Sequence, residues 1–124
     1  MRSRYAAAVI LAAIQLLGCN RSAKREAAAM TGGDPDRGAA NIATYGCGAC
    51  HTIPGISGAH GLVGPPLAGI GKRMYVAGVL PNQPANLMRW VQDPHSVNEA
   101  TVMPNLGVTP HDATDIAAYL YSLR

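Results

Sequence analysis

The sequence predicts a small all-α domain of three to five helices, and three observations lead to that prediction. Two segments open with a capping residue followed by proline, Asp34-Pro35 and Thr109-Pro110, which is how many helices begin. The apolar inventory is poor, with 14 Gly, 9 Pro, 1 Trp and no Phe in 124 residues. A domain with so few large hydrophobic side chains usually needs a disulfide, a metal or a cofactor to be stable. The third observation, Cys47-Gly48-Ala49-Cys50-His51, indicates which of these it has.

The spacing C-x-x-C-H is typical of a c-type haem attachment site. Cys47 and Cys50 would bond covalently to the two vinyl groups of one haem c, and His51 would be an axial ligand of its iron. A zinc or dithiol module is the alternative for the two thiols, but the chain has no second cysteine pair for zinc.

The helices are expected in three places. Residues 34–45 would form the first, ending at Gly46, with Gly38 and Ile42 on one face. Residues 84–92 would form the second, which carries the single tryptophan, Trp90. Residues 109–123 have apolar side chains at a period of 3.6, so this helix should pack against the Gly38 face.

The sixth ligand of the iron is expected from a loop. Met103 lies in a Pro-, Gly- and Asn-containing stretch where core filling is unusual, and its thioether suits a haem iron. His95 and His111 are the competing ligands, and His60 lies in the Gly- and Pro-rich loop 52–66. If Met103 does not bind, the open iron would suit a peroxidase or a gas sensor.

The N-terminus has the pattern of an export signal. Two arginines precede an apolar run that is too short to span a bilayer, which takes about 20 residues. The run ends Leu16-Leu17-Gly18-Cys19, which resembles the lipobox of bacterial lipoproteins, so residues 1–18 are predicted to be a lipoprotein signal peptide and Cys19 the lipidated residue. Ordinary cleavage near Gly18 is the alternative. Lipid on Cys19 and haem on the other two cysteines would account for all three.

Residues 19–33 have no apolar periodicity and are predicted to be a flexible, lipidated tether. The net positive charge belongs to the N-terminal residues, because residues 34–124 hold five basic and six acidic residues and have a net charge of −1. The basic isoelectric point is therefore no indication of nucleic-acid binding.

Over residues 34–124 the order of motifs resembles that of class I c-type cytochromes. The resemblance rests on Gly38, the C-x-x-C-H motif, Gly64-Pro65-Pro66-Leu67, Trp90 and Met103, followed by the C-terminal helix. It implies a small cytochrome c fold in which the carbonyl of Pro65 accepts a hydrogen bond from His51. It also implies that the haem propionates meet Arg73, Tyr75 and Trp90.

Residues 78–94 are similar to the cytochrome domain of subunit II of some haem–copper oxidases. The expected function is a single-electron carrier of a bacterial respiratory chain, rather than an enzyme. It would accept electrons from a quinol-oxidising complex and deliver them to a terminal oxidase or reductase. Its expected place is the periplasmic face of the cytoplasmic membrane, with no nucleic-acid or small-molecule substrate.

Overall fold

The computed structural model describes residues 20–124, so the predicted signal peptide and Cys19 lie outside the described residues. Helix α2 (Pro35–Thr44) begins at Asp34, whose carboxylate accepts hydrogen bonds from the backbone N–H groups of Asp36 and Arg37. The helix is followed by Gly46 at φ +74°, a left-handed conformation that glycine adopts without strain. The start and the end of this helix are where the sequence predicts them.

The other two expected helices are also present. Helix α3 (Pro84–Gln92) follows Gln83, which makes no side-chain cap, and helix α5 (Pro110–Ser122) is capped by the Thr109 hydroxyl. The all-α prediction is confirmed. The sequence did not indicate the four-residue helix α4 (Pro94–Val97) or two short 3₁₀ turns, η1 (Cys47–Ala49) and η2 (Ile70–Lys72). The sequence also did not indicate a short hairpin of two strands with two residues each, β1 (Tyr75–Val76) and β2 (Leu80–Pro81), in which Val76 lies opposite Leu80.

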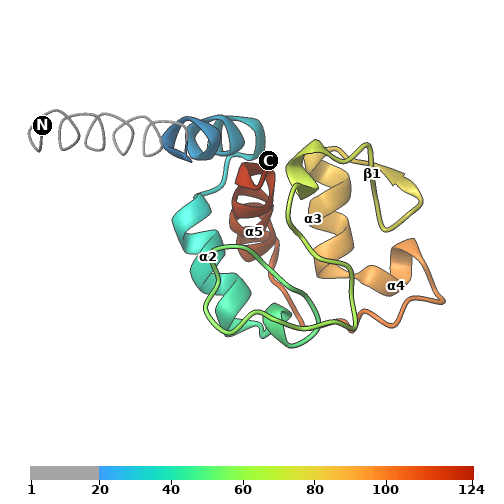
Figure 1. Ribbon diagram of the computed structural model, residues 1–124. Coiled ribbons are helices and arrows are strands. Elements are labelled where there is room, and N and C mark those ends of the chain that lie inside the picture. The colour runs from blue at the N-terminus through green and yellow to red at the C-terminus, as the bar shows by residue number, and fades with distance from the viewer. Residues whose placement is uncertain (1–19) are drawn as a thin grey trace, which may run out of the picture.

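Helices α2 and α5 cross at Gly38, with α3 packed on the other side of α5 (Figure 1). A Cβ at Gly38 would lie 2.0 Å from the carbonyl oxygen of Asp115, so only glycine allows the two backbones to approach this closely. Ile42, Ile116 and Leu120 are at most 3% exposed and form the core beside the crossing. The predicted contact between the Gly38 face and the C-terminal helix is therefore present.

A buried carboxylate also joins the two helices. Asp115, 1% exposed, accepts hydrogen bonds from Arg37 Nε at 2.8 Å, Arg37 Nη2 at 3.0 Å and the backbone N–H of Asp34 at 2.7 Å. The hydrogen bonds from the Arg37 guanidinium are the largest cause that lowers the pKa of Asp115. A carboxylate with this many donors is stabilised in its charged form in spite of its burial.

The expectation of a flexible tether is wrong for most of residues 19–33. Residues 20–31 form a helix, which we call the arm, and it lies across the end of the domain where the chain terminates (Figure 1). Ala27 is fully buried in the core, Lys24 pairs with Asp36 at 2.5 Å, and Glu26 pairs with Arg124 at 2.7 Å. The apolar contact consists of small alanine side chains, and sequence periodicity does not detect such a face.

No helix within residues 20–124 has the length and apolar character needed to cross a membrane.

Candidate haem site

A largely apolar cavity of about 520 Å³ opens in the side of the domain. Its walls come from η1, the loop after it, η2, the β1 hairpin, α3 and the loop before α5. All eight residues that the sequence analysis assigned to the haem line it: Cys47, Cys50, His51, Pro65, Arg73, Tyr75, Trp90 and Met103.

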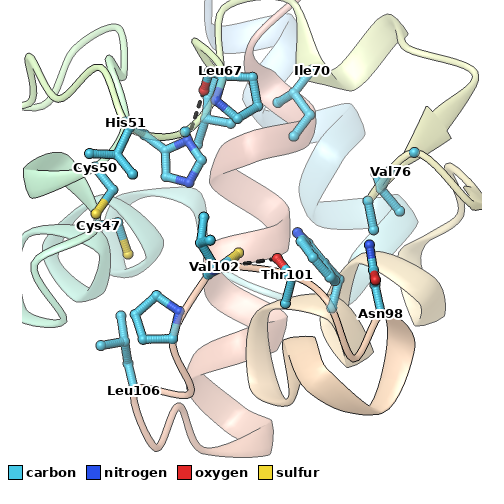
Figure 2. A pocket seen from close by; sticks show the side chains of 18 of the residues that line it. Cys47, Cys50, His51, Leu67, Ile70, Val76, Asn98, Thr101, Val102 and Leu106 are labelled. Carbon is cyan, nitrogen blue, oxygen red and sulfur yellow. Dashed lines mark hydrogen bonds between the residues drawn. The ribbon is translucent and has the colours of Figure 1, made fainter.

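The two cysteines and His51 reach the cavity because the chain makes a tight turn there. After Gly46, the backbone N–H groups of Cys50 and His51 both donate to the carbonyl of Cys47, at 3.2 and 3.0 Å. Cys47 and Cys50 are both partly buried and form no disulfide, and their sulfurs lie at one edge of the cavity (Figure 2). Burial raises the pKa of the Cys47 thiol.

The His51 ring is held by the loop that follows it. Its Nδ1–H donates to the carbonyl oxygen of Pro65 at 2.7 Å. A carbonyl can only accept, so Nδ1 carries the hydrogen and Nε2 keeps a free lone pair. Backbone hydrogen bonds from Gly64 to Cys50 (2.8 Å) and from Leu67 to Thr52 (2.9 Å) fix the loop that supplies this acceptor.

Across the cavity from His51 lies the segment before α5, which includes Thr101, Val102 and Leu106 (Figure 2). Met103 belongs to this segment, and its backbone N–H donates to the Thr101 hydroxyl at 3.2 Å. Met103 also lines a smaller apolar cavity of about 60 Å³ that is shared with His51 and Trp90. Met103 is therefore a cavity-lining residue of the segment that lies across the cavity from His51.

The three residues expected to meet the propionates lie at the cavity in different environments. The guanidinium of Arg73 donates to the carbonyls of Pro66 and Ala68, so it also braces the loop that carries Pro65. Tyr75 is 57% exposed on β1, whereas Trp90 is half-buried on α3.

Some cavity residues were missed by the sequence analysis. Asn98 and Thr101 add polar groups to the largely apolar wall, and Ile70 and Val76 come from η2 and β1. No sequence signal singles out one asparagine or threonine of a loop, because its position depends on how the loop folds back. His60, His95 and His111 do not line the cavity.

The residues present fit a haem c. The cavity has a volume of about 520 Å³ and a largely apolar lining, which suit a flat macrocycle. Two cysteine sulfurs lie at its edge, and His51, with its free Nε2 lone pair, lies across it from the loop that includes Met103. Residues 20–124 contain no group of three or more His, Cys, Asp or Glu side chains that could hold a bare metal ion.

Comparisons with known proteins agree with this chemistry. Residues 35–124 match the sequence model of the family described as "Cytochrome c". The chain is also 35% identical over 79 residues to a protein named "Cytochrome c oxidase subunit 2" from Alkalihalophilus pseudofirmus. The match covers 63% of this chain and 22% of that relative, so the chain spans about a fifth of the relative's length. No solved structure matches the chain.

Proposed function

Because this chain belongs to the cytochrome c family, which binds haem c and transfers electrons, we propose that it is a single-electron carrier of a bacterial respiratory chain. One observation carries the proposal. The cavity wall places an imidazole, with its Nδ1–H committed to Pro65, opposite the loop that carries Met103. If His51 and Met103 both ligated the iron, no position would remain open for a substrate.

In this proposal Cys47 and Cys50, which line the cavity, would hold one haem through thioether bonds, and His51 and Met103, which also line it, would ligate its iron. The haem iron supplies reversible one-electron chemistry, and a methionine ligand raises its potential. Pro65 orients His51 and increases its basicity through the Nδ1 hydrogen bond. Ile70, Val76 and Leu106 exclude water from the cavity. Arg73, Tyr75 and Trp90 would meet the propionates.

The proposed donor is a quinol-oxidising complex and the proposed acceptor a terminal oxidase or reductase. The similarity to a protein named as an oxidase subunit supports an acceptor of this kind. Residues 34–124 have a net charge of −1, so recognition would not depend on a strongly basic docking face.

The proposed attachment is a lipid on Cys19, which would hold the protein at the periplasmic face of the cytoplasmic membrane. The sequence Leu-Leu-Gly-Cys at residues 16–19 supports this. Mass spectrometry of the mature protein tests it directly, because the mass reports the cleavage site, the number of acyl chains and the number of haems. A mature chain without acyl mass would overturn the anchor.

The ligand assignment is tested by the visible spectrum of the oxidised protein. The far-red band of methionine bound to ferric iron should be present in the wild type and absent in Met103→Ala. A matched variant, Met74→Ala, removes an exposed methionine that does not line the cavity and should keep the band. A wild-type spectrum without this band would instead favour a peroxidase or a gas sensor with an open iron.

Covalent attachment has a separate test. Haem staining of a denaturing gel should detect the wild-type chain, and the stain should be lost in the double variant Cys47→Ala/Cys50→Ala. An unstained wild-type chain would favour the zinc or dithiol alternative.

A further inference from the structure

The arm at residues 20–31 is held on the domain by specific contacts. Ala27 is fully buried, and ion pairs on either side of it join Lys24 to Asp36 and Glu26 to Arg124. At the end of the arm, a Cβ at Gly33 would lie 2.3 Å from the carbonyl oxygen of Thr114, so the chain passes directly against α5. The arm therefore has one face toward the domain and one away from it.

The outward face carries positive charge. Arg21 and Arg25 are four residues apart and so lie one above the other on the helix. Arg25 is two residues before the buried Ala27, which places it on nearly the opposite side at 3.6 residues per turn. Both arginines are exposed, and neither has an acidic partner within residues 20–124.

The charges elsewhere make this face distinct. Lys24 and Glu26, the other charged residues of the arm, are paired with the domain. Residues 1–19 contain no Asp or Glu that could neutralise the two arginines, and residues 34–124 carry a net charge of −1. This face, whose first arginine lies two residues after Cys19, should thus attract a negatively charged surface.

We propose that this face, Arg21 and Arg25, binds the headgroups of anionic phospholipids and so orients the domain on the membrane. The inference rests on the proposed function for the nearness of the membrane. A lipid anchor at Cys19 would limit only the distance of the domain from the membrane. A helix that is docked on the domain and binds lipid through its basic face would also limit the rotation of the domain. No residue of the arm lines the haem cavity, so the cavity stays open to a partner while the arm lies on lipid.

Vesicle binding tests this with the haem-loaded mature chain carrying Cys19→Ser, so that no acyl chain contributes. We expect binding to vesicles of phosphatidylcholine with one third phosphatidylglycerol, and weaker binding as salt rises. Each arginine near such a surface contributes about fivefold in affinity, so Arg21→Ala/Arg25→Ala should lose about 25-fold. Vesicles of phosphatidylcholine alone should bind neither protein.

The matched control is Arg89→Ala, which also removes the positive charge of an exposed arginine, but from α3 and not from the arm. It should bind the anionic vesicles within twofold of the Cys19→Ser chain. The proposal would be overturned if Arg89→Ala lost as much vesicle affinity as the double variant, or if the affinity were the same with and without phosphatidylglycerol. An acidic protein would then remain as the partner of this face. Haem absorbance and helix content are recorded on the same samples. If a folded, haem-loaded chain fails to bind the anionic vesicles, the lipid-binding proposal is wrong and the proposed function is unaffected.

Discussion

Gly64 and His51 are in direct contact, and the contact depends on the absence of a side chain. A Cβ at Gly64 would lie 2.3 Å from Cε1 of His51 and 2.6 Å from Nδ1. Residue 64 must therefore be glycine for the His51 ring to keep its position beside the carbonyl of Pro65. The Gly-Pro pair at 64–65 thus acts on both the position and the tautomer of the imidazole.

Gly64→Ala should displace the His51 ring and weaken its hydrogen bond to Pro65. We expect a lower yield of haem-loaded protein and a shifted potential, because second-sphere changes typically cost 10- to 100-fold in metal affinity. The control is Gly58→Ala, which strains a backbone at φ +74° but meets nothing within 4 Å. Redox titration of both variants makes the comparison. Equal potentials in the two would mean that the contact with His51 has no effect.

Gly38→Ala should destabilise the fold, although the same change in an isolated helix would stabilise it by about 1 kcal/mol. The added methyl would lie 2.0 Å from the carbonyl oxygen of Asp115 and would separate α2 from α5. Overpacking of this kind costs about 1–3 kcal/mol. Urea denaturation measures the free energy of unfolding, with Thr44→Ala on the exposed face of α2 as the control. A more stable Gly38→Ala variant would contradict the close packing.

Asp115→Asn should remove the charge that pairs with Arg37. Breaking a buried pair costs about 3–5 kcal/mol, and we expect the lower end because Arg37 remains 57% exposed. Glu99→Gln, a change on an exposed carboxylate that takes part in no described ion pair, is the matched control. Denaturation at pH 7 should separate the two variants, and a loss below about 1 kcal/mol in Asp115→Asn would place the pair among ordinary surface pairs.

Stability should also fall at low pH through the same carboxylate. The pKa of Asp115 in the folded state is lowered from its ordinary value of 3.8, mainly by the Arg37 guanidinium. Its contribution is then complete above about pH 4 and is lost as the pH falls through the lowered pKa. Denaturation midpoints measured from pH 6 to pH 2 should drop steeply in the wild type. The drop should be smaller in Asp115→Asn, and identical slopes would contradict the assignment.

Ala27→Asp should release the arm, because a carboxylate would replace a fully buried methyl without a described partner. Trypsin should then cleave after Lys24 and Arg25 faster than in the wild type. Ala29→Asp places the same group on the exposed side of the arm and should leave the cleavage rate unchanged. Equal rates in both variants would show that the arm is not docked through Ala27.

Local signals predicted helices α2, α3 and α5 well, but not the helix at residues 20–31. Asp34 and Thr109 are capping residues whose hydrogen bonds close within one turn, and Gly46 ends α2 through its own backbone conformation. Such signals act over a few residues and can be recognised before the chain folds. The hairpin at β1 and β2 was missed because its strands are only two residues long.

By itself the sequence determined the chemistry of the site: two thiols, an imidazole and a thioether loop, in an order typical of one family. Only the tertiary structure decided which groups share the cavity, since Asn98 and Thr101 reach it through a loop without periodicity. It also decided that residues 20–31 are a docked helix. The physical reason is that these contacts join residues separated in the chain, which meet only in the folded state. The burial of Ala27 and the close approach of Gly64 to His51 are two examples.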